Sequence, residues 1–311
     1  MQQETWLMSG VSLAVSAFQN EMSNGGCCNG HPGAQRKVFL WAVPRSISTA
    51  FFRAMMTSAD IKVMLEPFAR SYYFGSQRVS HRYKSQPIND GCTFHDIKLL
   101  CEKEAADSLA PTLFVKDMAY YLVNKLDEPT YIPEGFQHTF LIRNPRRAVT
   151  SLYKLSLNES LTGWDHFDEA EVGFKELVQM FDLVKNKLGQ TPFVIDADDL
   201  LANPEKMLRA YCSKTGIKYE DSMVNWESTP PDMSVFQEWM PWFEGTLKST
   251  AFRTTPIPPK KSDMMKGGIF ALPDNVEACI ANNMDYYNYL YKHRLTFDNL
   301  DSFDSVAANS T

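Results

Sequence analysis

Hydrophobic residues along the chain gather in short runs that alternate with longer stretches of helical spacing. The short runs are typical of buried strands and lie at 37–43, Ile61–Leu65, Thr112–Val115, His138–Ile142 and Thr191–Ile195. Strands separated by helices through the whole chain favour a parallel sheet covered on both faces. The pattern therefore predicts an α/β fold with three layers, αβα, around a central parallel sheet.

Helical spacing of the apolar residues predicts the elements between these strands. After Pro44, four apolar side chains (Phe51, Phe52, Met55 and Met56) fall on one side of a helix. Further helices are expected over 93–107, 118–126, 146–157, 167–187 and 275–291, with another that follows Asn203-Pro204 and runs through Tyr211. The aromatic segment Phe68–Phe74 is expected to be a helix or a loop.

The remaining stretches lack such periodicity. Residues 1–36 end in a Gly- and Asn-rich segment and are expected to form a flexible N-terminal arm. Residues 37–300 are expected to form a single domain, and residues 301–311 a frayed tail. Within the domain, residues 225–259 are rich in aromatic residues and proline, which favours a lid or a region that shapes a substrate site.

The net charge and the positions of the cysteines argue against several classes of function. The 311 residues carry a formal net charge of −6, which argues against general binding of nucleic acid or an anionic membrane. Any anion site must therefore be a local cluster of cations. The six cysteines are scattered without a C-x-x-C pair, so we expect reduced thiols and no metal site.

One apolar run bears on location. Residues 6–18 have the length of a signal-peptide core, but Glu4 precedes them without any Lys or Arg, and serines dilute the run. The run is also too short to cross a bilayer. We therefore expect a cytoplasmic protein without stable membrane insertion, and the secretory pathway is the alternative that this run leaves open.

A cation and three hydroxyls follow the first predicted strand: Arg45, Ser46, Ser48 and Thr49. A strand–turn–helix gathers backbone N–H groups around one point at the positive end of the helix dipole, which suits a phosphate or sulfate. The loop is not a nucleotide-hydrolase loop, because no G-x-x-x-x-G-K-[ST] is present. The alternative is that Ser48 or Thr49 merely caps the helix.

Charged residues also end the second and third predicted strands. Glu66 follows the second, and Lys116-Asp117 ends the third. Ligands bind outside the carboxyl ends of the strands in open parallel sheets, so Glu66 is placed beside the first loop and is a candidate general base. The alternative is a capping glutamate, or one paired with Arg70 four residues later.

A second anion-binding point is expected after the fourth strand. Arg143 lies at the strand end, and Ser151 follows eight residues later on the next helix, so both can face one ligand group. Together with the first loop, this suits a nucleotide that carries anions at both ends of its ribose. The alternative for Arg143 is a surface arginine, and Arg146 and Arg147 beside it are candidates for simple solvated charges.

Three motifs, in order, resemble the sulfotransferase superfamily that uses 3′-phosphoadenosine 5′-phosphosulfate (PAPS). Pro44-Arg45-Ser46-Ile47-Ser48-Thr49 is similar to its 5′-phosphosulfate loop, P-[KR]-S-G-[ST]-[ST]. Arg143 with Ser151 is similar to its 3′-phosphate motif. Residues 194–205, Val-Ile-Asp-Ala-Asp-Asp-Leu-Leu-Ala-Asn-Pro-Glu, are similar to its late strand-to-helix run. The resemblance spans residues 37–216.

The resemblance implies a P-loop NTPase-like sulfotransferase fold and an enzyme that moves a sulfuryl group from PAPS to an acceptor hydroxyl by in-line transfer. Arg45, Glu66 and Lys116 would be its catalytic residues, with Glu66 as the base and Lys116 at the transferring group or the acceptor. The residues that would hold the donor are Arg45, Ser46, Ile47, Ser48, Thr49, Arg143 and Ser151, with Lys260 and Lys261 as a loose match to the family's C-terminal element.

The chain also departs from the family pattern. Ile47 stands where the family usually has glycine, and the aromatic residue that often follows the loop is missing near Ala50. Ile47 and the loosely matched C-terminal element support one alternative, an inactive nucleotide-binding or scaffold protein on the same fold. A nucleotide-dependent phosphotransferase is the other alternative, and the missing G-x-x-x-x-G-K-[ST] counts against it. The aromatic segments favour a small-molecule hydroxyl acceptor over a glycan or a peptide, whereas the placement of Glu66 resembles members of the family that act on peptides and sugars. A homodimer is the open alternative to a monomer.

Overall fold

The computed structural model describes residues 35–252 and 271–296. Within these ranges five parallel strands form a sheet in the order β2-β3-β1-β4-β5. The strands are β1 (Arg36–Ala42), β2 (Ile61–Leu65), β3 (Thr112–Met118), β4 (Gln137–Ile142) and β5 (Val194–Asp196). The predicted parallel sheet is confirmed, and β1 begins at the last residue of the expected N-terminal arm. Residues 1–34 of that arm, the expected tail and both Lys260 and Lys261 lie outside the described residues.

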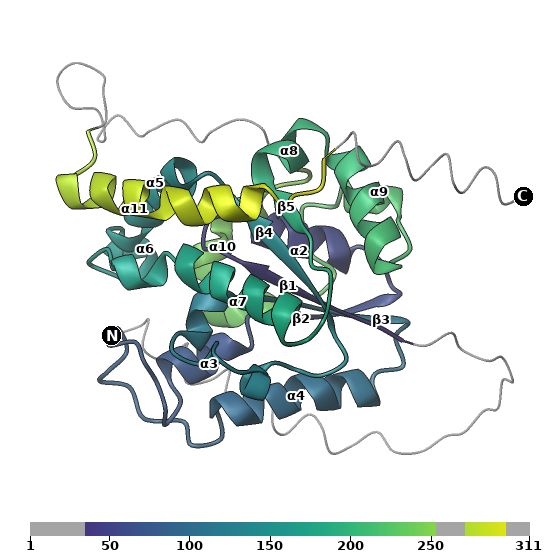
Figure 1. Cartoon of the computed structure of the whole chain (residues 1–311), viewed down its shortest axis with the longest axis horizontal. Coiled ribbons are helices and arrows are strands. Elements are labelled where there is room, and N and C mark those ends of the chain that lie inside the picture. Colours follow the sequence, from purple (N-terminus) through teal and green to yellow (C-terminus); the bar gives the residue numbers. More distant parts are fainter. Residues whose placement is uncertain (1–34, 253–270, 297–311) are drawn as a thin grey trace, which may run out of the picture.

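Helices connect the strands and cover both faces of the sheet (Figure 1). The α-helices are α2 (Ser48–Met56), α3 (Phe68–Tyr73), α4 (Phe94–Asp107), α5 (Pro145–Ser156), α6 (Glu159–Thr162), α7 (Phe174–Asn186), α8 (Ala197–Ala202), α9 (Pro204–Thr215), α10 (Met240–Leu247) and α11 (Asp274–Tyr291). Short 3₁₀ segments are η2 (Ala119–Leu122), η3 (Pro129–Tyr131), η4 (Glu169–Glu171), η5 (Asp221–Met223) and η6 (Ser234–Trp239).

Two consecutive residues of β4 show which helices cover which face. Successive strand side chains point to opposite faces. The Thr139 hydroxyl lies 2.9 Å from the Tyr211 hydroxyl of α9, whereas the Phe140 ring packs 5.1 Å from the Phe181 ring of α7. Helices α9 and α7 therefore cover opposite faces. Phe51 of α2 contacts Tyr211, which places α2 on the α9 side and completes the three layers.

Two predicted helices are wrong in part. The expected helix 118–126 is reduced to η2, because β3 continues through Met118. The expected helix 167–187 begins only at Phe174, because Gly173 adopts a left-handed backbone angle, φ 78°. Gly173 is also required sterically, since a Cβ atom there would lie 3.2 Å from Tyr120.

The position of Lys116 and Asp117 also needs correction. Both residues lie inside β3 and are fully buried, so they do not project from the end of the strand. The Asp117 carboxylate accepts hydrogen bonds of 2.8 Å from the backbone N–H groups of Phe68 and Met118. Burial raises the pKa of Asp117 well above its usual range. Asp117 therefore serves to hold the start of α3 against the sheet.

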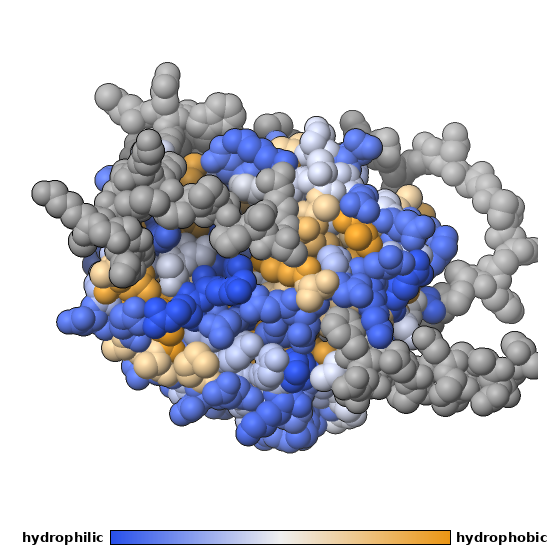
Figure 2. Space-filling view, turned by 90° about the horizontal axis from the view of Figure 1, so that it is seen from above, coloured by the Kyte–Doolittle hydropathy of each residue, from blue (hydrophilic) through white to orange (hydrophobic). Residues whose placement is uncertain are grey.

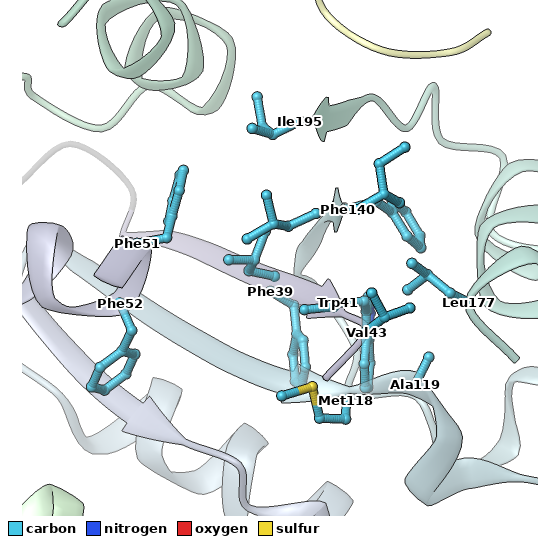
Figure 3. Close-up of a cluster of buried hydrophobic side chains, with 14 of the residues drawn as sticks. Phe39, Trp41, Val43, Phe51, Phe52, Met118, Ala119, Phe140, Leu177 and Ile195 are labelled. Carbon is cyan, nitrogen blue, oxygen red and sulfur yellow. The ribbon is translucent and has the colours of Figure 1, made fainter. Parts of the chain in front are cut away.

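The apolar core lies between the sheet and its helices. Figure 3 shows Phe51 and Phe52 of α2 and Leu177 of α7 on opposite sides of the strands, where all three are fully buried. The face in Figure 2 is largely hydrophilic where it is coloured, with orange groups between blue residues. Among the described residues no helix is long and apolar enough to cross a membrane.

Candidate active site

The loop after β1 has an unusual backbone. Arg45 (φ 63°) and Ile47 (φ 65°) both adopt left-handed angles, which non-glycine residues seldom hold and which occur preferentially at functional sites. Ile47 is the N-cap of α2, and no side chain caps this helix or places an acid in its first turn. The interpretation of Ser48 or Thr49 as the N-cap is therefore wrong. The first N–H groups of α2 are left available to an anion.

The hydroxyl groups of this loop divide into two roles. The Ser46 side chain is fully buried and donates a hydrogen bond of 2.7 Å to the Val43 carbonyl oxygen, which braces the loop from within. Ser48 and Thr49 instead line a cavity that extends from the loop across the carboxyl ends of β1, β2 and β3. The predicted loop hydroxyls are thus brought together around one cavity, with Ser46 supporting its floor.

Two guanidinium groups from distant parts of the chain meet at this loop. Arg45 Nε donates to Ser151 Oγ at 3.2 Å, and its Nη1 donates to the Trp242 carbonyl oxygen at 3.1 Å. Arg143 Nη1 donates to the Arg45 carbonyl oxygen at 3.0 Å. The predicted juxtaposition of Arg45, Arg143 and Ser151 is present, and both arginines line the cavity.

This pair of arginines makes the end of the cavity strongly cationic. Burial, together with the neighbouring Arg143 charge, lowers the pKa of Arg45 to about 10, so Arg45 is still a cation at neutral pH. Burial also lowers the pKa of Arg143. The Arg143 Nε group is buried and has no hydrogen-bond partner among the described residues. An anionic ligand would relieve the repulsion and satisfy this donor.

The neighbouring arginines of the same segment behave differently. Arg146 is exposed and pairs with Glu277 of α11, and Arg147 is exposed and pairs with Asp198 at 3.2 Å. They are solvated surface charges, which is the alternative that the sequence left open for them. Arg143 differs because it lies at the strand end and is turned toward the loop.

Glu66 faces the same cavity from the end of β2. Its carboxylate accepts a hydrogen bond of 3.0 Å from the Tyr121 hydroxyl and is also bonded to the Lys116 ammonium. Arg70 pairs instead with Glu238 at 3.0 Å, so the alternative of a Glu66–Arg70 pair is wrong. Glu66 holds a left-handed angle, φ 50°. Lys116 is fully buried behind Glu66 and is not among the residues that line the cavity.

Aromatic side chains form the rest of the cavity wall. They come from α3, η2, the segment before η4, η6 and α10, and comprise Tyr73, Tyr120, Tyr121, Trp164, Trp239, Trp242 and Phe243. The Trp239 Nε1 group is buried and has no partner in the parts of the chain that the structure describes. The cavity therefore joins a cationic end to an aromatic chamber, with Glu66 between them.

Several residues of this chamber could not be identified from the sequence. Glu171 lines the cavity but lies in a segment with a helical pattern, and Arg82, its partner at 2.6 Å, is 89 residues away. Trp164 carried no pattern signal at all. One feature of the sequence could have indicated this chamber. Tyr120 and Tyr121 come soon after a predicted strand that ends in two charged residues.

These observations describe an α/β protein in which an uncapped helix N-terminus and an unsatisfied guanidinium group meet at one cavity. The sequence model of the Sulfotransferase domain family matches residues 36–273. The chain therefore belongs to this family, and the predicted resemblance is confirmed. Membership supports transfer of a sulfuryl group in general.

Individual relatives are distant. Branched-chain-amino-acid aminotransferase-like protein 2 of Arabidopsis thaliana is 28% identical over 243 residues, which cover 73% of this chain and 38% of the relative. Sulfotransferase ppzF of Metarhizium rileyi is 20% identical over 344 residues, which cover 86% of this chain and 98% of the relative. A solved sulfotransferase domain from the curacin biosynthetic pathway is 15% identical, with a TM-score of 0.42 over 82% of this chain and 99% of that one.

Proposed function

We propose that this protein transfers a sulfuryl group from PAPS to the hydroxyl of a small molecule. The observation that carries the proposal is the single cavity in which Arg45 and Arg143 meet the uncapped start of α2 and Glu66 faces the aromatic chamber. Bound PAPS would supply an activated sulfuryl group and a phosphate leaving group. The chain's own residues would supply position and charge.

The cationic end would hold the nucleotide. Arg45, the α2 N–H groups and the hydroxyls of Ser48 and Thr49 would bind the 5′-phosphate and stabilise the charge that develops on it. Arg143 and Ser151 would bind the 3′-phosphate, which distinguishes this donor from ATP. Ser151 now accepts a hydrogen bond from Arg45, so its hydroxyl proton is free to face an anion.

Glu66 would act as the general base for the acceptor hydroxyl. Its carboxylate is buried, with 6% of its surface exposed, and is oriented by Tyr121 and Lys116. This contact makes Lys116 a positioning residue that holds the Glu66 carboxylate in place. Contact between Lys116 and the transferring group, which the family resemblance implies, would require Lys116 to leave Glu66.

The aromatic chamber supports an acceptor that is an aromatic or largely apolar alcohol. Stacked and edge contacts between aromatic rings favour a flat apolar ligand, and Trp239 Nε1 could donate to one oxygen of it. Glycans and peptides are the acceptors that this chamber disfavours, because aromatic rings make up most of its wall.

The base assignment is tested with Glu66→Gln. We expect turnover of PAPS with 2-naphthol to fall by at least about 100-fold, because general-base catalysis contributes that much. Binding of adenosine 3′,5′-bisphosphate should change little, and this binding also reports that the variant is folded. Glu238→Gln is the matched control, since Glu238 pairs with Arg70 away from the cavity. Unaltered turnover in Glu66→Gln would remove the base assignment.

A further inference from the structure

Two buried nitrogen atoms in the cavity wall have no hydrogen-bond partner among the described residues. They are Arg143 Nε and Trp239 Nε1. Burial of an N–H group without a partner costs free energy, so such groups are rare in folded proteins and each needs an explanation. Arg143 belongs to the cationic end of the cavity, where the proposed nucleotide accounts for it. Trp239 belongs to the aromatic chamber and indicates a second contact with a ligand.

Two neighbouring donors of the chamber wall are already used within the protein. The Tyr121 hydroxyl donates to Glu66 Oε2 at 3.0 Å, and Trp164 Nε1 donates to the Tyr83 hydroxyl at 2.8 Å. Trp239 is only 7% exposed and its Nε1 atom is buried, so bulk water does not satisfy this N–H group. Among the described residues of the chamber wall, Trp239 Nε1 is therefore the buried donor that is left for a ligand.

Trp239 contacts residues other than those that orient Glu66. The centre of its ring lies 5.3 Å from that of Tyr73 and 6.1 Å from that of Phe74. Tyr73 in turn packs 5.7 Å from Tyr121, whose hydroxyl contacts Glu66. The Tyr73 ring thus links Trp239 to the end of the chamber where Glu66 lies. A ligand whose hydroxyl meets Glu66 would therefore meet Trp239 Nε1 with a different atom.

The carboxylates of the chamber wall, Glu66 and Glu171, are both paired with cations already. Glu66 is bonded to Lys116, and both oxygens of Glu171 accept hydrogen bonds of 2.6–2.8 Å from Arg82. The side chains of Glu171 and Arg82 are themselves buried. A charged ligand group in the chamber would therefore be buried without a free counter-charge, which is costly. The chamber thus favours ligand groups that carry no charge.

We propose that Trp239 selects acceptor molecules that carry, besides the reacting hydroxyl, a second and uncharged oxygen such as that of a ketone; this rests on the proposed transfer to a hydroxyl at Glu66. Trp239 Nε1 donates a hydrogen bond to the second oxygen, while the aromatic rings of the wall hold the carbon skeleton between the two points. An aromatic alcohol without this oxygen leaves the indole N–H group unpaired and reacts less well. A carboxylate at that point is disfavoured, because it would be buried without a cation.

The test uses Trp239→Phe, which keeps an aromatic ring but removes the donor. The acceptor molecules are matched pairs in which an acetyl group is replaced by isopropenyl, so that a CH₂ group stands in place of the carbonyl oxygen. The pairs carry this group at position 6 of 2-naphthol, at position 7 of 2-naphthol, or at position 4′ of 4-phenylphenol. For each pair the ratio of kcat/KM, ketone over alkene, is measured with PAPS in the parent and the variant. Comparison of the two ratios cancels the intrinsic reactivity of each phenol.

For at least one pair we expect the parent's ratio to exceed that of Trp239→Phe by about tenfold, the worth of one hydrogen bond. Trp164→Phe is the matched control, because Trp164 lines the same chamber but its N–H group is already bonded to Tyr83. This control should keep the parent's ratio, and an equal fall in both variants would overturn the proposal. If the parent turns over 2-naphthol while Trp239→Phe leaves all three ratios unchanged, the selection by Trp239 fails and the proposed function stands.

A second measurement needs no turnover, so it separates the selection by Trp239 from the proposed function. The indole N–H groups are followed by NMR of tryptophan-labelled parent protein, and the Trp239 signal is assigned by its loss in Trp239→Phe. With adenosine 3′,5′-bisphosphate present, the ketone of at least one pair should move the Trp239 indole proton downfield, and its alkene should move it less. A signal that moves equally with ketone and alkene in every pair, or not at all, would overturn the proposal. Absence of turnover with every acceptor molecule, together with the expected NMR difference, would instead contradict the proposed function alone.

Discussion

Arg45 and Ile47, two non-glycine residues of the loop after β1, hold left-handed backbone angles. The family pattern has glycine where Ile47 stands, and the structure shows the physical reason, since only glycine adopts such an angle without strain. This chain has the same loop geometry with an isoleucine at that position, and the left-handed angle costs conformational energy. Ile47 packs in part against the core, which offsets some of this cost.

This strain predicts an unusual order of stability. Ile47→Gly should be more stable than Ile47→Ala by about 1 kcal/mol, because the left-handed angle penalises the alanine Cβ. The control is Ala50 inside α2, where Ala50→Gly should destabilise by about 1 kcal/mol. Denaturant unfolding of the three variants measures both differences. An alanine at position 47 that is as stable as glycine would show that the loop is not strained there.

His138 predicts a pH dependence of stability. It is buried in β4, where its Nδ1 accepts a hydrogen bond of 3.0 Å from Trp41 Nε1. Burial lowers the pKa of His138 from 6.5 to about 3. The unfolded chain therefore takes up a proton below pH 6.5 that the folded state refuses until about pH 3. Above pH 6.5 the titration of His138 does not change the free energy of unfolding. Below pH 6.5 the free energy of unfolding falls by about 1.4 kcal/mol per pH unit, down to about pH 3.

The measurement compares His138→Asn with the parent by denaturant unfolding at pH 7 and pH 5. Asparagine keeps an acceptor for Trp41 but does not titrate, so the parent should lose about 2 kcal/mol more than the variant between these values. His95 is exposed on α4, and His95→Asn should keep the parent's pH dependence. Identical pH dependence in His138→Asn and the parent would show that the folded state does not disfavour protonation of His138.

At the scale of elements, one buried arginine of α2 holds the segment that carries α10. Arg53 Nη1 donates to the carbonyl oxygens of Thr246, Leu247 and Ser249 at 2.8–3.1 Å, and its Nη2 donates to that of Glu227 at 2.7 Å. The guanidinium carbon also lies 5.6 Å from the centre of the Trp226 ring. These bonds tie the aromatic segment, which the sequence predicts to shape the substrate site, to α2, the helix that follows the loop with Arg45.

Arg53→Met should therefore loosen this segment as well as lower stability. We expect a loss of about 3 kcal/mol in the free energy of unfolding, since several buried carbonyls lose their donor. Amide hydrogen exchange in 240–249 should accelerate more than exchange in the sheet. Arg209→Met is the control, because Arg209 is an exposed arginine on α9 and its loss should cost under about 1 kcal/mol. Unchanged exchange in 240–249 would contradict the anchoring role.

At the scale of the whole molecule, the sequence predicted the parts of the fold and site that depend on local pattern. The five strands, the loop with Arg45, and the approach of Arg143 and Ser151 to that loop all follow from short apolar runs and from the rule that ligands bind at the carboxyl ends of parallel strands. The placement of Glu66 beside the loop follows from the same rule.

The remainder depends on contacts between segments far apart in the chain, which no local pattern encodes. The Glu66–Lys116 bond spans 50 residues and the Arg82–Glu171 pair 89. The start of α7 depends on how closely Gly173 approaches Tyr120. Each of these is decided by three-dimensional packing, so the sequence could name Glu66 but not the contacts with Lys116 and Tyr121 that orient it.

The proposed function requires Arg45 and Arg143 to act as a two-point clamp for a nucleotide with a 5′- and a 3′-phosphate. Calorimetric titration of adenosine 3′,5′-bisphosphate and of AMP into Arg143→Ala tests this clamp, with Arg146→Ala, at an exposed arginine in the first turn of α5, as the control. We predict that Arg143→Ala weakens the bisphosphate by about 10- to 100-fold, the worth of charge-assisted hydrogen bonds, and AMP little. Equal weakening of both nucleotides, or none, would contradict the clamp.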